Sequence, residues 1–111
     1  MTTTNWIDLC SLDDLVADSG VCALVGEEQV ALFYLPADNK VYAVGQYDPI
    51  GKANVMSRGL IGSSGDDIYV ASPLYKQRFR LTDGTCLDDD TVSLPSWATE
   101  IAGNRVRIQT A

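Results

Sequence analysis

The stretch Val21–Val44, which reads VCALVGEEQVALFYLPADNKVYAV, decides the fold. It holds three runs of apolar and β-branched residues, separated by the turn segments Gly26–Glu28 and Pro36–Asn39. Runs of this kind between Gly, Pro, Asn and Asp are typical of strands. Connections this short join antiparallel neighbours. The sequence therefore predicts a three-stranded meander over residues 21–25, 29–35 and 40–44.

The flanking sequence repeats this alternation on both sides. Asp83-Gly84 and Gly103-Asn104 are typical hairpin turns, and Ser11 followed by Asp14 predicts one short helical turn over 12–16. Many short strands with almost no helix predict an all-β fold, an antiparallel β-sandwich or small barrel formed by residues 1–111 as one domain. The further strands are predicted at 6–10, 68–71, 78–81, 86–87, 97–101 and 105–108.

Residues 45–67 differ from the flanking sequence in composition. They include five glycines and few apolar runs, so no clear strand is predicted there. A long segment of this kind inside a small domain is usually functional. Within it, Gly59–Gly65 places a glycine at every third position. This spacing lacks the dinucleotide-binding pattern and its β-α-β context, so we expect a flexible loop.

Composition excludes several classes of function. The chain contains no histidine, which rules out Ser-His-Asp and Cys-His catalysis and histidine-ligated metals. A formal charge of −7 disfavours binding to nucleic acid or anionic membranes. The start, Met1–Trp6, lacks the features of a signal peptide, and no apolar run is long enough to span a membrane. We therefore expect a cytoplasmic location.

The cysteines and the charge clusters have simple interpretations. Cys10, Cys22 and Cys86 form no C-x-x-C pair, and we expect buried apolar side chains rather than ligands or a disulfide. The run Asp88–Asp90 lacks the spacing of a calcium loop and predicts a solvated turn. The basic cluster of Lys76, Arg78 and Arg80 fits either an exposed strand face or a docking spot for an acidic patch on a partner.

Two segments carry a more specific signal. They are Tyr42–Pro49, YAVGQYDP, and Val70–Phe79, VASPLYKQRF, which is followed by Asp83-Gly84. This order resembles the Rieske iron–sulfur domain, in which a C-x-H loop follows a strand and a C-P-x-H loop precedes a phenylalanine and a hairpin. The closing segment Leu94–Gly103 also resembles the end of such domains. The resemblance covers nearly the whole chain and implies a Rieske-like fold.

The resemblance places the former cluster-ligand positions at Gln46, Asp48, Ser72 and Tyr75. None of them is the cysteine or histidine that the family uses there. An amide and a hydroxyl are poor substitutes for thiolate, because iron–sulfur clusters select soft sulfur ligands. Tyr75 is bulkier than histidine and is expected to fill the vacated site. The implied domain therefore has no iron–sulfur cluster, no other metal and no cofactor of its own.

One branch of the family matches more closely. The segments Asp48-Pro49, Lys52-Ala53, Ser57–Gly59 and above all Ala71–Gln77, ASPLYKQ, resemble the small subunit of NADH-dependent assimilatory nitrite reductase. The resemblance implies an accessory, non-catalytic subunit in nitrate assimilation. The implied partner is a large catalytic subunit that carries FAD, siroheme and a four-iron cluster and reduces nitrite to ammonium with NAD(P)H.

The tip, where cluster-binding relatives meet their partners, supplies the candidate contacts. Tyrosine and arginine commonly anchor interfaces. The alternative for these residues is that Tyr75 and Phe79 pack the tip while Asp48 caps a turn beside Pro49. Two other functions stay open: a stand-alone Rieske-fold binding module with a small ligand in the vacated site, and an electron carrier that holds iron through Cys86 and carboxylates. The predicted partner-binding residues are Tyr47, Asp48, Pro49, Tyr75, Lys76 and Arg78; no catalytic residue is predicted.

Overall fold

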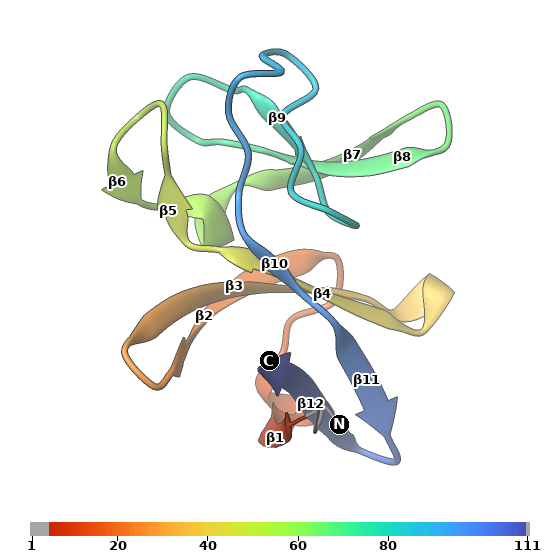
Figure 1. Ribbon diagram of the computed structural model, residues 1–111. Helices are drawn as coiled ribbons and strands as arrows, with labels where there is room; N and C mark the ends of the chain where they lie inside the picture. The colour runs from red at the N-terminus through yellow and green to blue at the C-terminus, as the bar shows by residue number, and fades with distance from the viewer. Residues whose placement is uncertain (1–4, 111) are drawn as a thin grey trace, which may run out of the picture.

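The computed structural model describes residues 5–110, and its strands form three layers and a small ribbon (Figure 1). The terminal sheet has the order β1-β12-β11, the central sheet β10-β4-β3-β2 and the outer sheet β7-β8-β9, and the ribbon pairs β5 with β6. The strands are β1 (Asn5–Ser11), β2 (Ser19–Val25), β3 (Glu28–Leu35), β4 (Lys40–Gly45), β5 (Tyr47–Asp48), β6 (Ala53–Asn54), β7 (Leu60–Ser64), β8 (Asp67–Ala71), β9 (Arg78–Arg80), β10 (Ser96–Trp97), β11 (Thr99–Ala102) and β12 (Arg105–Thr110).

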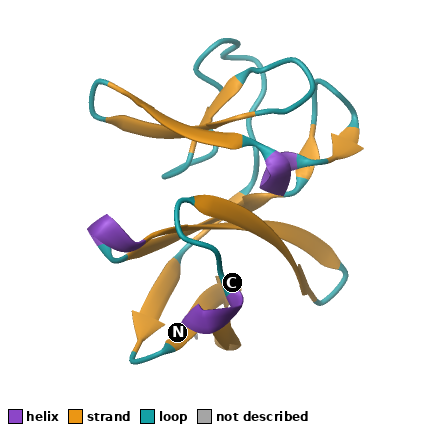
Figure 2. Cartoon of the chain, turned by 180° about the vertical axis from the view of Figure 1, so that it is seen from behind, coloured by secondary structure: helices purple, strands orange, loops and turns teal. Residues whose placement is uncertain are grey.

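Among residues 5–110, helix is limited to three short 3-10 turns, which Figure 2 shows in purple. They are η1 (Leu12–Asp14), η2 (Pro36–Asp38) and η3 (Met56–Arg58). The Ser11 capping box before η1 is present as predicted, although the turn is shorter than the predicted 12–16. No helix among residues 5–110 is long and apolar enough to cross a membrane.

The predicted meander is confirmed as β2, β3 and β4, which pair antiparallel in sequence order. The turn from β2 to β3 places Gly26 at φ +62°, a backbone conformation that glycine adopts without a Cβ penalty. The all-β prediction is also confirmed. The sandwich has three layers, because both faces of the central sheet are covered.

Strand β3 shows why its sequence is continuously apolar. Val30 and Leu32 face the terminal sheet, while Ala31 and Phe33 face the outer sheet, and all four are buried. A strand covered on both faces loses the alternation of a half-exposed strand. The terminal core, between the terminal and central sheets, comprises Val30, Leu32, Val41, Ala43, Val106 and Ile108. The outer core, between the central and outer sheets, comprises Ala31, Phe33, Leu35, Val44, Met56, Val70, Phe79, Leu81, Cys86 and Leu94.

The expectation that residues 45–67 contain no clear strand is wrong. The segment contains β5, β6, η3 and β7, and β7 pairs with β8 from Leu60↔Ala71 to Ser64↔Asp67. A flexible loop over 59–65 is therefore also wrong. Gly62 lies within β7, opposite Tyr69 of β8. A Cβ at this position would lie 2.6 Å from the Tyr69 ring. Its glycine reflects close packing, not mobility.

Two smaller predictions also need correction. In the hairpin predicted around Asp83-Gly84, only Arg78–Arg80 forms a strand, and Cys86 joins it by a single bridge to Phe79. All three cysteines are free, but only Cys86 is buried. Cys10 is half-buried, and Cys22 is exposed because it lies on β2, the outermost strand of the central sheet.

Candidate functional site

The positions that the resemblance assigns to former cluster ligands lie on two loops of similar design, which we call the tip (residues 46–57 and 72–77). The first loop follows β4 and the second follows β8. The Lys52 N–H donates to the Asp48 carbonyl at 2.7 Å, and the Lys76 N–H donates to the Ser72 carbonyl at 3.0 Å. Both lysines adopt the left-handed backbone conformation, with φ values of +59° and +65°. Each loop thus starts at a polar residue followed by proline and closes on a left-handed lysine.

Asp48 joins the two loops. Its Oδ1 accepts hydrogen bonds from the N–H groups of Ile50 at 2.8 Å and Gly51 at 3.0 Å. Its Oδ2 accepts one from the Ser72 hydroxyl at 2.5 Å. The carboxylate is fully buried, so these three donors replace the water that it would otherwise bind. Asp48 therefore acts as an internal support for both loops.

Ser72 completes the link from the second loop. Its Oγ accepts the Leu74 N–H at 3.2 Å, and its own N–H donates to the Gln77 carbonyl at 2.9 Å. Gly51 lets the loops approach, because a Cβ there would clash with the Leu74 side chain and lie 2.9 Å from Asp48 Oδ2. Direct contacts between the loops therefore occupy the place where a ligand would have to bind.

Gln46, at the first former ligand position, holds the segment before η3. Its Nε2 donates to Ser57 Oγ at 2.9 Å and to the Asn54 carbonyl at 3.3 Å, and its Oε1 accepts the Ser57 N–H at 2.8 Å. The side chain is almost fully buried. Every polar atom of the amide thus has a partner within the chain.

The fourth position differs from the expectation. Tyr75 does not fill the vacated site: 66% of the residue is exposed. Leu74, not Tyr75, packs against the other loop at Gly51.

The donor set does not fit an iron–sulfur cluster. Gln46, Asp48 and Ser72 are committed to hydrogen bonds within the chain, and Tyr75 is exposed on the surface. Cys86 is buried in the outer core. Within the described part of the chain, no group of three His, Cys, Asp or Glu residues is placed to hold a metal ion. This geometry gives no support to iron held by Cys86 and carboxylates.

The structure divides the six predicted partner contacts. Tyr47, Tyr75 and Lys76 are exposed at the tip, and Pro49 is half-exposed. Asp48 is fully buried, so its side chain offers nothing to a partner while the loops stay closed. Aromatic side chains beside a cation are typical of interface anchors.

The sixth candidate, Arg78, makes its contacts within the chain. Its guanidinium makes two bonds to the Asp88 carboxylate, at 2.7 Å and 3.2 Å, and lies 5.5 Å from the centre of the Tyr69 ring. The hydrogen bonds from Arg78 hold the pKa of Asp88 below its ordinary value. Arg80 is likewise paired, with Asp67 and Asp83. Of the predicted basic cluster, only Lys76 has no ion pair within the described residues.

Sequence reasoning missed Lys52 and Leu74 as tip residues. Both belong to a pair of similar pentapeptides, DPIGK over 48–52 and SPLYK over 72–76. Each reads as a polar residue, proline, an aliphatic residue, a variable residue and lysine. This internal similarity was the signal that could have identified Lys52 as the counterpart of Lys76 in the other loop.

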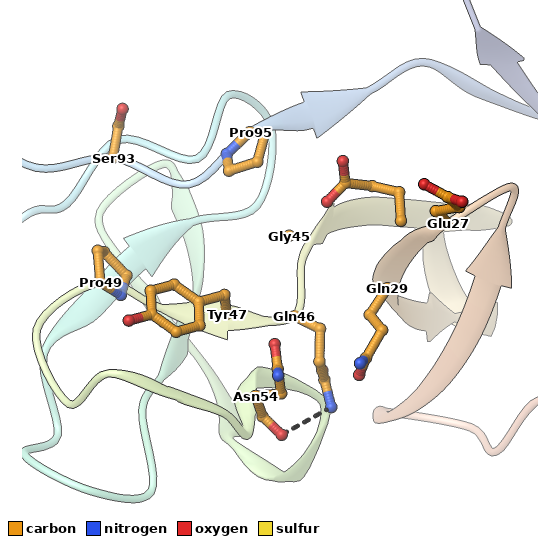
Figure 3. A pocket seen from close by; sticks show the side chains of 10 residues that line it. Glu27, Gln29, Gly45, Gln46, Tyr47, Pro49, Asn54, Ser93 and Pro95 are labelled. Carbon is orange, nitrogen blue, oxygen red and sulfur yellow. Dashed lines mark hydrogen bonds between the residues drawn. The ribbon is translucent and has the colours of Figure 1, made fainter.

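An open groove of about 330 Å³ lies beside the tip (Figure 3). The β2–β3 turn with Glu27 and Glu28 forms one side, and Tyr47 and Pro49 form the other. Gln46 lines it, but its amide is already satisfied, as the dashed bond to Asn54 illustrates. No free buried polar group in the described chain therefore marks the groove as a ligand site.

The three-layered fold and the two paired loops define the class of protein. The model of the Rieske-like 2Fe-2S domain matches residues 5–109, and the chain belongs to this family. Within it, the chain belongs with the nitrite reductase small subunits. It is 41% identical over 106 residues to the nitrite reductase (NADH) small subunit of Escherichia coli, covering 96% of this chain and 98% of that protein.

Two further comparisons extend this likeness. The NMR structure of the Escherichia coli protein NirD superposes with a TM-score of 0.88 at 39% identity, covering 98% of this chain and 99% of that one. The chain is also 40% identical over 101 residues to the nitrite reductase NAD(P)H large subunit of Klebsiella oxytoca. That match covers 91% of this chain and 10% of the larger protein.

Proposed function

We propose that this chain is the accessory small subunit of a cytoplasmic NAD(P)H-dependent nitrite reductase and supports a large catalytic subunit in reducing nitrite to ammonium. The observation that carries the proposal is that residues at the tip make hydrogen bonds within the chain instead of holding a cluster. The loops of a Rieske-like domain are retained, while the former ligand positions Gln46, Asp48 and Ser72 are spent on internal hydrogen bonds. A domain with this tip supports binding better than electron transfer.

The Klebsiella match supports the choice of partner. In that organism a segment similar to nearly the whole of this chain lies within the large-subunit polypeptide. Joining two domains in one chain raises their effective concentration, which favours domains that act together. We therefore propose that this chain binds a separate large subunit. FAD, siroheme and a four-iron cluster belong to that partner, and this chain contributes no cofactor.

We place the contact at the tip. Tyr47 and Tyr75 expose aromatic rings, and Lys52 and Lys76 add two cations without ion pairs among the described residues. On a chain of charge −7 these lysines make the tip locally basic. Opposite charge on the partner increases the association rate and fixes the orientation of docking. The tip thus fits an acidic patch with room for aromatic side chains.

Reconstitution tests the function. NADH-dependent nitrite reduction by the purified large subunit is measured with and without this chain, together with co-elution on a sizing column. We expect a complex and a higher rate of nitrite reduction. A chain that neither co-elutes nor changes the rate would contradict the proposal, and stoichiometric iron in the purified chain would favour the electron carrier instead.

Charge reversal tests the surface. Lys76→Glu should weaken binding about tenfold, because desolvated interface charges contribute on the order of 1–2 kcal/mol. Lys40→Glu is the matched control, since Lys40 is also exposed but begins β4 at the end away from Gly45 and the tip. Equal effects of the two reversals would remove the tip from the interface and leave only a net-charge effect.

A further inference from the structure

Strand β2 is an edge strand with little of the usual protection, apart from the packing of its Gly20 end against η3. It spans Ser19–Val25 and pairs only with β3 among residues 5–110 (Figure 1). It carries no charge, no proline and no bulge. By contrast, edge strand β1 has a bulge between Asp8 and Cys10. Natural proteins normally block exposed edges with such devices, because a free edge accepts another strand.

The register shows which backbone groups of β2 are free. Leu24 lies opposite Gln29, and the Gln29 carbonyl accepts the Gln46 N–H at 3.2 Å on the other side of β3. In an antiparallel strand the N–H and C=O of one residue point to the same side. The Leu24–Gln29 pair is therefore not hydrogen-bonded, and Leu24 directs its backbone groups outward. By alternation, Cys22 and Gly20 do the same.

The side chains of β2 also alternate, between the two faces of the central sheet. Val21, Ala23 and Val25 pack against the terminal core and hold the strand in place. On the opposite face Cys22 is exposed, and Leu24 is 66% exposed. The strand is thus anchored by one face, exposes Cys22 and Leu24 on the other, and directs three pairs of backbone groups away from β3.

Acidic side chains stand at both ends of this edge. Asp18 precedes the strand, and Glu27 and Glu28 follow it; all three are exposed and have no ion pair among the described residues. An added strand with basic residues at both ends would complement them. A second copy of this chain would not, because antiparallel pairing centred on Cys22 brings Asp18 of one copy near Glu27 of the other. Like charges that meet across strands are destabilising.

We propose that the β2 edge binds an extended segment of a partner protein as an added strand of the central sheet. The segment has an uncharged, β-branched middle that pairs with Gly20, Cys22 and Leu24, and lysine or arginine at each end. Backbone hydrogen bonds would supply affinity, and the end charges would select the segment. This surface adjoins the tip across the groove lined by Glu27 and Tyr47, and the proposal goes beyond the function proposed above.

Amide exchange measured by NMR tests the proposal. The probe is a nine-residue peptide with alternating threonine and valine in the middle and two lysines at each end; the control peptide has glutamates at its ends. When the lysine peptide occupies most of the protein, we expect it to slow amide exchange about tenfold at Gly20, Cys22 and Leu24. Val21, Ala23 and Val25, whose amides already bond to β3, should not change. This alternation separates strand addition from side-chain packing.

Two variants sharpen the test. Cys22→Pro removes an outward N–H without removing a bond to β3, and it should abolish the protection. Because proline can also disturb the strand, Glu27→Lys combined with Glu28→Lys serves as the second variant. These exposed changes should weaken the lysine peptide about tenfold and strengthen the glutamate peptide by a similar factor, since only the end charges are reversed.

Three results would overturn the proposal. One is unchanged exchange at Gly20, Cys22 and Leu24 at millimolar lysine peptide. Another is equal protection by both peptides, which would deny the role of the end charges. The third is protection in the protein alone that grows with its concentration together with a dimer on a sizing column, which would assign the edge to a second copy of the chain.

Discussion

The two sides of the central sheet are held by different means. On one side the terminal core is entirely apolar, with Val106 and Ile108 fully buried against β3 and β4. On the other side the outer core continues into the tip. Among the described residues, the buried polar side chains are Gln46, Asp48 and Ser72, and all three lie at the tip. Apolar packing suffices to join sheets, whereas loops without a regular ladder need directional bonds to a specific partner.

The largest expected effect would come from the outer core and would test whether apolar packing dominates there too. Phe33→Ala should lower the free energy of unfolding by about 4 kcal/mol, because the cavity lies between the central and outer sheets. Urea unfolding measures the loss, and Tyr47→Ala, at an exposed ring, is the control. A loss below about 1 kcal/mol would show that the outer core collapses around the cavity, which a well-packed interior resists.

The next effect would isolate the directional bonds of the tip. Asp48→Ala should cost about 3 kcal/mol, because it leaves the partly buried Ile50 and Gly51 N–H groups and the buried Ser72 hydroxyl without an acceptor. Ser72→Ala should cost less.

The pair of substitutions also measures coupling. If the Asp48–Ser72 bond is the main link, the double variant should lose clearly less than the sum of the single variants. Additive losses would mean that each loop closes independently, and the comparison of the two sides would lose its basis.

A smaller effect is expected at Gln46. Gln46→Ala should cost about 2 kcal/mol, since the Ser57 N–H loses its acceptor in a partly buried setting. Amide exchange should accelerate at Ser57 while β3 stays protected. Equal acceleration in β3 would show that the tip and the central sheet open as one unit rather than separately.

The smallest effect concerns the exposed pair Arg78–Asp88, each side chain being more than a third exposed. Asp88→Asn should cost less than about 1 kcal/mol at neutral pH. The pKa of Asp88 is lowered in the folded chain, so its contribution is present above the unfolded pKa and is lost as the pH falls through the folded one. Thermal unfolding from pH 7 down to about pH 2 should show the difference vanish in acid; a constant difference would exclude this ion pair as its source.

The sequence was informative where strands are regular. The meander over 21–44 was predicted because apolar runs and short turns are local features, and β2, β3 and β4 confirm it. It was misleading over 45–67, because the five glycines suggested mobility. The packing of Gly62 on the Tyr69 ring is a cross-strand contact between β7 and β8, which the glycine content of the segment does not reveal.

The contacts of the candidate site could not be predicted from the sequence. The order of motifs predicts four former ligand positions, and that assignment stays a prediction, whereas the bond from Asp48 to Ser72 spans the two loops and requires coordinates. The size of Tyr75 suggested filling, but both Leu74 and Tyr75 are exposed, and it is Leu74 that contacts Gly51 of the other loop.

The link between Asp48 and Ser72 has a consequence for how the protein is made. In a cluster-binding domain the corresponding loops stay incomplete until iron and sulfide are delivered. Here every group that closes the loops leaves the ribosome as part of the chain. Under the function proposed above, the tip matures once the chain has been synthesised and folded, without delivery of iron or sulfide.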